Sequence, residues 1–337
     1  MALRVVLLLS LLSWCPAVAA VSCSSNPGAA PLGQEYWQDL NDPNYLLALD
    51  GRRLIVSYAG RVREVLGILS QQGAETARIC YSGRETTTVL RQQGDELVFH
   101  DPFRDQTHRL WRRRGGGRPA SLSLDSFLLP APSAMGVEKV QEVRRELWQR
   151  SQGDQAALGH QRQLIPAKES LPWLKKESSI APDPQDPRQE IQFADLAMKN
   201  IEYLRGLLLE VGWIDVQRFG YGASNSAFLL LQHSWDVPVM VAVLPYLKKD
   251  VDQGLMESDT YALLYDRLQL ALGSRQRYGS QIARTPQGEI FVLPVEDKPA
   301  EVDSLRHQLG LIPLADYVHV FGASTVQFSS DCQPHPE

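Results

Sequence analysis

Short apolar runs separated by turn residues characterise the first third of the chain. From Arg53 to Arg114 the sequence alternates between strand-like and turn-like segments about every 8 to 12 residues. The expected strands are Leu54 to Tyr58, Val62 to Leu69, Thr76 to Ser82, Glu85 to Arg91, Glu96 to His100 and Thr107 to Trp111. This pattern predicts an antiparallel β meander that forms either a small barrel or a sandwich.

The second half of the chain has a helical period. Apolar residues at steps of three and four predict a helix that buries one face and ends at Gly212. The stripe consists of Ala194, Ala197, Ile201, Leu204, Leu208 and Val211. Further helices are expected over 224–234, after Asp236 with a kink at Pro245, over 259–272 and over 297–308. Segments 276–284 and 289–295 predict one β-hairpin.

A polar stretch that contains several prolines separates these two patterns. Val137 to Arg150 has the spacing of an amphipathic helix, whereas Ser151 to Gln189 is polar and carries prolines at 182, 184 and 187. We therefore expect an α+β protein of two modules, an N-terminal β meander and a mainly helical C-terminal domain with one hairpin. The predicted boundaries are 1–19 for a signal peptide, 34–118 for the β-rich module, 135–190 for the helix and linker, and 191–325 for the helical domain.

The first residues resemble a secretory signal peptide. Arg4 precedes an apolar run from Val5 to Trp14, and Ala17-Val18-Ala19 supplies small residues for a signal peptidase. Two alternatives stay open, an uncleaved N-terminal anchor and a lipoprotein with its lipid on Cys23. Each of the three predicts an exported chain, periplasmic or extracellular, whose only contact with a membrane is through the N-terminus.

Composition and motifs exclude several classes of protein. The 337 residues are 44% hydrophobic and 22% charged, which is typical of a folded soluble chain, and the net charge of −5 argues against a nucleic-acid-binding protein. No Cys-x-x-Cys pair, His-Glu-x-x-His motif or phosphate-binding loop occurs, so neither a metal nor a nucleotide cofactor is expected. Cys23, Cys80 and Cys332 allow one disulfide, but we favour Cys80 as an unbridged buried strand residue.

A basic segment follows the last expected strand. Arg112, Arg113, Arg114 and Arg118 surround three glycines. These arginines suggest an anion-binding loop, but charged runs more often face water, and we favour a solvated exit from the strand.

Four blocks between about Gln189 and Phe321 resemble DUF6624, a bacterial family known only as a domain of unknown function. The blocks are Gly212-Trp213; Gln232-His233; Asp266-Arg267 with Gln276-Arg277-Tyr278-Gly279-Ser280-Gln281; and Asp303 with Arg306, Gly310-Leu311 and Tyr317. Ser280 stands where the family usually has threonine, and Ile214 where it tends to have proline. The resemblance implies a fold for this region but no activity, because the family has none that is settled.

The same blocks hold the candidate functional residues. His233 with a carboxylate from Asp236 or Asp266 would form an acid/base pair, and an arginine would bind an anionic group. The candidate ligand-binding residues are Gln232, Arg267, Gln276, Tyr278, Gln281 and Arg306. The alternative is that His233 is a satisfied core residue and that Asp266 and Arg267 form an internal ion pair.

These observations favour an exported bacterial envelope protein that binds an unidentified small molecule or envelope component, or that serves a structural or interaction role. The alternative is a hydrolase or transferase that uses His233. The two hypotheses differ in one geometric respect: a site requires His233, Arg267, Gln281 and Arg306 to meet at a solvent-accessible cavity.

Overall fold

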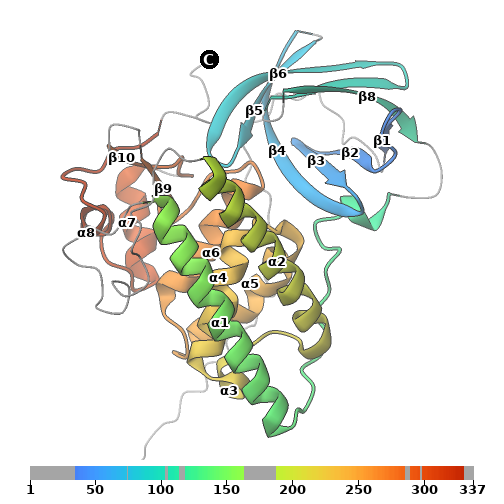
Figure 1. Cartoon of the computed structure of the whole chain (residues 1–337). Coiled ribbons are helices and arrows are strands. Elements are labelled where there is room, and N and C mark those ends of the chain that lie inside the picture. Colours follow the sequence, from blue (N-terminus) through green and yellow to red (C-terminus); the bar gives the residue numbers. More distant parts are fainter. Residues whose placement is uncertain are drawn as a thin grey trace, which may run out of the picture.

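The computed structural model describes residues 35–73, 75–102, 105–113, 118–162, 187–284, 289–296 and 298–329. It contains an antiparallel β-barrel and a mainly helical region, and the barrel lies against one end of the helices (Figure 1). The predicted fold class is therefore confirmed. The predicted signal peptide and Cys23 lie outside the described residues.

Eight strands form the barrel, each paired with the next in the chain. They are β1 (Tyr36–Asp39), β2 (Tyr45–Asp50), β3 (Arg53–Tyr58), β4 (Arg61–Gln72), β5 (Thr76–Tyr81), β6 (Arg84–Gln93), β7 (Glu96–Asp101) and β8 (Gln106–Arg113). Pairing of β1 with β8 closes the sheet, so the module is a barrel and not a sandwich. The first two strands precede the meander that the sequence predicted.

Two-residue turns fix the register of the neighbouring strands. Ala59 and Gly60 join β3 to β4, and Ser82 and Gly83 join β5 to β6. All four residues have positive φ angles, between 49° and 79°. Turns of this kind match the right-handed twist of a hairpin, which is why glycine stands at the second position of each.

Strands β2 to β4 are buried on both faces. Leu54, Val56 and Leu66 point into the barrel core, while Ile55 and Val65 point outward and pack with the helices. These strands consequently read as continuous apolar runs, whereas β6 and β8 have one solvated face and alternate between buried and exposed positions.

A short 3₁₀ helix, eight α-helices and a small hairpin make up the rest of the described chain. They are η1 (Ala120–Leu122), α1 (Val137–Arg162), α2 (Pro187–Val211), α3 (Val216–Phe219), α4 (Tyr221–Ser234), α5 (Val237–Asp252), α6 (Ser258–Ala271), β9 (Ile282–Arg284), β10 (Ile290–Val292), α7 (Pro299–Gln308) and α8 (Leu314–Val320). No described helix is both long enough and apolar enough to cross a bilayer.

Helix α1 packs as part of the helical region and is longer than the sequence predicted. It continues twelve residues past Arg150, into the segment expected to be polar linker. Arg144 donates a hydrogen bond to the Phe219 carbonyl at 2.6 Å, and the Ser151 and Ser226 hydroxyls lie 2.9 Å apart. Both pairs are separated by 75 residues in the sequence, so later residues of α1 contact later residues of the α3–α4 segment. Helices α1 and α4 therefore run parallel.

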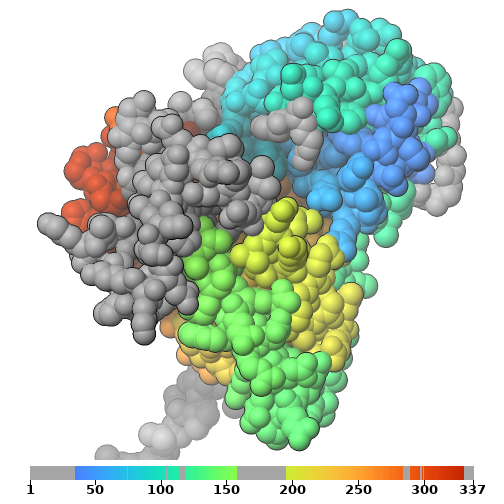
Figure 2. All heavy atoms as spheres, in the orientation of Figure 1, coloured from blue at the N-terminus to red at the C-terminus, as the bar shows by residue number. Residues whose placement is uncertain are grey.

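The barrel and the helices meet backbone to backbone. A Cβ atom on Gly67 of β4 would lie 2.1 Å from the carbonyl oxygen of Gly273, which follows α6. Both positions must therefore be glycine. An ion pair between Arg61 of β4 and Glu202 of α2 also joins the two regions. The barrel and α2 lie side by side in Figure 2.

Cys80 is buried on β5 and forms a disulfide bond whose partner lies outside the described residues. The expectation of an unbridged Cys80 was therefore wrong. Burial alone was correctly predicted, but the strand pattern does not show that the sulfur faces outward from the barrel.

Candidate functional site

The loop 276–281 is held by a single buried carboxylate. Asp266 on α6 is fully buried, and its oxygens accept hydrogen bonds from the backbone N–H groups of Arg277 (2.8 Å), Tyr278 (3.0 Å) and Ser280 (2.8 Å). Burial raises the pKa of Asp266, and these N–H groups oppose that rise. Asp266 thus replaces the backbone partners that the loop lacks.

Three polar side chains complete the inner face of this loop. Gln276 donates to the carbonyls of Gln281 (2.9 Å) and Leu293 (2.7 Å), and its own oxygen accepts from the Gln281 N–H (2.8 Å). Arg267 donates to the side-chain oxygen of Gln281 at 2.9 Å and lies over the ring of Trp235. The side-chain amide of Gln276 and the side-chain oxygen of Gln281 thus form their hydrogen bonds within the protein.

Arg306 and Tyr317 close the loop from the other side. Arg306 is buried, donates to the carbonyls of Ile312 and Tyr278, both at 2.7 Å, and has a pKa lowered by burial. The Tyr317 hydroxyl donates to the Ser280 carbonyl at 2.7 Å. These hydrogen bonds hold the Arg306 guanidinium against the backbone, where it supports the fold.

The ring of Tyr278 packs against other tyrosines. Its centroid lies 5.6 Å from Tyr265 and 6.3 Å from Tyr261, with the rings steeply inclined to each other. Edge-to-face packing of this kind stabilises the cluster itself and does not present a flat stacking surface.

His233 belongs to a different part of the molecule. Its Nδ1 lies 2.5 Å from Asp154 Oδ2 on α1, and both side chains are buried. Asp236, expected as its partner, instead bonds Arg205 (2.8 Å) and caps α5 through the Val239 N–H (3.2 Å). Asp266 holds the loop described above, so the sequence named neither carboxylate correctly.

The predicted site therefore separates into unequal parts. Asp266, Arg267, Gln276, Tyr278, Gln281 and Arg306 lie together in one closed network, as their shared sequence blocks suggested. His233 and Asp236 contact other partners, while Gln232 is buried on α4. His233 and the loop network are therefore held by separate sets of contacts.

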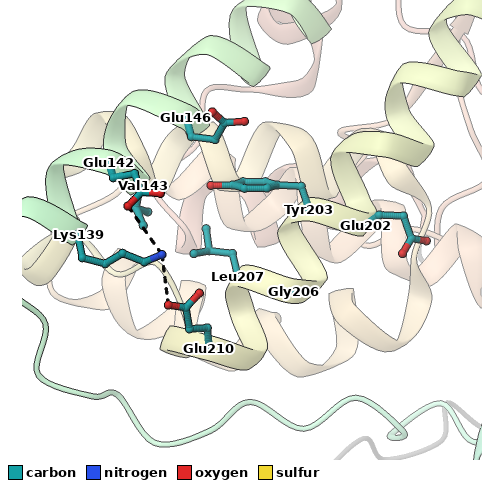
Figure 3. Close-up of a pocket in the computed structure, with 9 residues that line it drawn as sticks. All are labelled: Lys139, Glu142, Val143, Glu146, Glu202, Tyr203, Gly206, Leu207 and Glu210. Atoms are coloured by element: carbon teal, nitrogen blue, oxygen red, sulfur yellow. Dashed lines mark ion pairs between the residues drawn. The ribbon is translucent and has the colours of Figure 1, made fainter.

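An open groove lies elsewhere, between α1 and α2 (Figure 3). It has a volume of about 390 Å³ and a floor of Val143, Leu207 and Gly206. Its walls carry Lys139, Glu142, Glu146, Glu202, Tyr203 and Glu210. We call this feature the α1–α2 groove.

Negative charge dominates the α1–α2 groove. Four glutamates and one lysine line it, and Lys139 is shared between Glu210 at 3.3 Å and Glu142 at 3.9 Å. Burial together with Glu146 raises the pKa of Tyr203 to about 12, so its phenol stays protonated and can donate or accept a hydrogen bond.

Two arginines mark the ends of the groove. Arg150 bonds Glu146 at 2.7 Å and lies over the Tyr203 ring, and Arg61 of the barrel pairs with Glu202. Glu142 and Glu210 are left with Lys139 between them. The groove was not predicted from the sequence, although Glu142 and Glu146 are four residues apart and therefore lie on one face of α1.

The arginines at the end of β8 and after it do not form an anion site among the described residues. Arg112 lies over the Trp37 ring and within 3.5 Å of Glu35, and Arg118 donates to the Leu122 carbonyl at 2.7 Å. Arg114 lies outside the described residues. No group of three potential metal ligands occurs in the described part of the chain.

Comparison with known proteins confirms the resemblance of the C-terminal region. Residues 176–326 match the model of a family described as "Family of unknown function (DUF6624)". The barrel and α1 precede the matched residues. No curated protein and no solved structure gives a significant match to the chain.

Proposed function

We propose that this protein is an exported binding protein of the bacterial envelope, and that the α1–α2 groove is its ligand site. The observation that carries this proposal is an open groove of about 390 Å³ in which the carboxylates of Glu142 and Glu210 share the single ammonium group of Lys139. The residues expected to perform catalysis are instead occupied by contacts inside the fold.

The groove favours a ligand with a positively charged nitrogen on an aliphatic stem. The carboxylates of Glu142 and Glu210 would accept charge-assisted hydrogen bonds, and the apolar floor would contact the stem. Amines with two or more ammonium groups fit this description, as does a lysine-rich peptide segment. Such binding weakens as salt is added.

Isothermal titration of the full mature chain with spermidine tests this proposal, with 1,4-butanediol as the uncharged control. We expect spermidine alone to bind. At a hundredfold excess over its dissociation constant it should stabilise the fold by about 2.7 kcal/mol. A double variant, Glu142→Gln with Glu210→Gln, should weaken binding at least tenfold.

Asp195→Asn is the matched control, because Asp195 is an exposed carboxylate on α2 that does not line the groove. It should bind spermidine like the wild type. Equal weakening in both variants would mean that the protein attracts cations only through its overall charge, and the groove would lose its assignment.

Two observations support export. The N-terminal sequence has the pattern of a signal peptide, and the disulfide at Cys80 is of a kind that persists in oxidising compartments. Expression with the native N-terminus followed by mass analysis of the mature chain tests this. Cleavage after residue 19 is expected, and a diacylglycerol adduct on Cys23 would establish the lipoprotein alternative.

The alternative function is a hydrolase or transferase. One observation favours it, the Asp154 carboxylate behind His233 Nδ1, which is the arrangement that orients a general base. His233→Gln and Asp154→Asn, assayed against a panel of ester, amide and glycoside substrates, decide the question. Turnover by the wild type that both variants abolish would replace the binding proposal with an enzyme.

A further inference from the structure

We infer that Lys139 limits the α1–α2 groove to one ammonium group of a ligand, because the lysine's own ammonium group already lies between Glu142 and Glu210. This inference rests on the proposed function and concerns which amines the groove accepts. A short diamine should therefore bind through one of its ends only, although its two charges match the two carboxylates.

The side chain of Lys139 lies between the two helices that form the groove. Figure 3 shows it extending from α1 toward Glu210 on α2. Its Nζ atom lies 3.3 Å from a carboxylate oxygen of Glu210 and 3.9 Å from one of Glu142. An ammonium group on an aliphatic stem, which is the chemistry proposed for the ligand, is thus already supplied by the protein.

The other two glutamates of the groove are paired with arginines. Glu146 accepts a hydrogen bond from one arginine at 2.7 Å, and Glu202 forms an ion pair with another. Glu142 and Glu210 have Lys139 between them, so their two negative charges exceed its charge by one. One ammonium group of a ligand neutralises this excess, whereas a second adds a positive charge for which the described groove has no further carboxylate.

The ion pairs of Lys139 are open to a competing ligand. The exposed fraction of the side chain is 38% for Lys139, 61% for Glu142 and 57% for Glu210. Exposed pairs of this kind are weak, so a ligand can share the two carboxylates with the lysine. Because Lys139 is part of the chain, it stays beside them at a high effective concentration and competes with a second ammonium group at every ligand concentration.

The spacing of the two carboxylates suits a short diamine once the lysine is removed. Both oxygens lie within 3.9 Å of the same nitrogen atom, so their separation is at most twice that distance. Two ammonium groups on a four-carbon chain can then each meet one carboxylate, and the second contact follows from the first without a further loss of translational freedom.

Titration of the full mature chain with 1-aminobutane and with 1,4-diaminobutane tests the inference, with both affinities measured by NMR at low salt. For the wild type we expect the diamine to bind no more than about twofold tighter, because either of its ends can enter the groove but only one binds. For Lys139→Gln we expect the diamine to bind at least about fivefold tighter than the monoamine.

Two further variants separate the role of Lys139 from its charge alone. Lys199→Gln removes the same charge from an exposed residue of α2 that does not line the groove, and it should keep the wild-type ratio of the two affinities. Lys139→Arg keeps a cation at the position itself, and it should keep that ratio as well.

The outcomes distinguish this inference from the proposed function. An unchanged ratio in Lys139→Gln, or an equal rise in Lys199→Gln, would overturn the inference, while amine binding by the wild type would still support the groove as a site. Binding by Lys139→Gln alone would also overturn it, because the lysine would then exclude every ligand ammonium group. If neither protein binds either amine, the proposed function fails and the inference fails with it.

Discussion

The loop 276–281 and the α1–α2 groove are both rich in polar side chains, but these side chains face the protein interior in the loop and solvent in the groove. In the loop, the side chains of Asp266, Gln276 and Arg306 form hydrogen bonds with backbone groups of the protein. In the groove, Glu142 and Glu210 face solvent and share one lysine. The polar groups of the loop are therefore paired within the protein, whereas the two carboxylates of the groove have only one ammonium group between them.

The comparison shows that a cluster of polar residues in sequence does not by itself mark a ligand site. The blocks shared with the family of unknown function contain the loop, where they support the fold. The groove takes one wall from α2, inside the matched residues, and the other from α1, outside them. Ligand binding is thus expected between α1 and α2, two segments that no shared sequence block connects.

Removing the Asp266 carboxylate should have the largest effect. Asp266→Ala leaves three backbone N–H groups without their acceptor in a buried site, so we expect a loss of about 3–5 kcal/mol of unfolding free energy. Urea denaturation measures it. Asp259→Ala on the exposed face of the same helix is the control and should cost about 1 kcal/mol or less. A loss below that for Asp266→Ala would mean that the loop is held by other contacts.

Tyr317→Phe tests the loop with a smaller change. It removes one hydroxyl and leaves the Ser280 carbonyl without that donor, so a loss of about 1–2 kcal/mol is expected. The matched control is Tyr221→Phe, whose hydroxyl bonds Glu257 in an exposed position. If the two variants melt alike, burial adds nothing to the value of the Tyr317 bond.

Glu210→Gln should barely change stability, in contrast to the loop variants. Its ion pair with Lys139 is solvent-exposed, and pairs of this kind contribute about 0–1 kcal/mol. We expect a change within about 0.5 kcal/mol by urea denaturation, together with weaker spermidine binding. A large loss of stability would show that the groove is as integral to the fold as the loop.

The titration of Asp250 should make the unfolding free energy depend on pH. It is buried, accepts from Trp213 Nε1 at 3.0 Å, and burial raises its pKa above the ordinary value of about 3.9. Between those two pKa values the folded chain holds a proton that the unfolded chain lacks, so this group adds stability as the pH falls. Asp250→Asn should remove this dependence on pH, because an amide does not titrate in this range.

Unfolding free energies of both proteins at several pH values between 7 and 4 measure the difference. The gap between wild type and variant should move in favour of the wild type as the pH is lowered. A constant gap would show that Asp250 titrates at the same pH in the folded and unfolded chains.

The sequence predicted the barrel strands where turn residues punctuate them, and the helices where one face is apolar. It missed the second half of α1 because the face buried there is polar: Ser151 meets Ser226 and Asp154 meets His233. A hydrophobic period cannot show such a face. The strands β1 and β2 were missed as well: β1 has only four residues, which is too short to show a period, and β2 pairs with β1 and β3.

The candidate site was predicted in part. Asp266, Gln276, Gln281 and Arg306 were grouped in the sequence because such residues are costly to bury. They lie together in the structure. Their role was not readable, because it depends on which backbone N–H and carbonyl groups the loop turns inward. The partner of His233 lay in the segment that was taken for a linker.

The contact between Gly67 and Gly273 has a consequence for engineering and for divergence of this architecture. Because the two segments touch through main-chain atoms, no side chain at this contact can compensate for a change in the opposite segment. A helical region transplanted onto a foreign barrel would need a residue without a Cβ at the receiving position. The contact therefore does not depend on side-chain chemistry, but it has no room for a Cβ atom on either side. The barrel and the helical region could each be combined only with a partner that also has glycine at this contact.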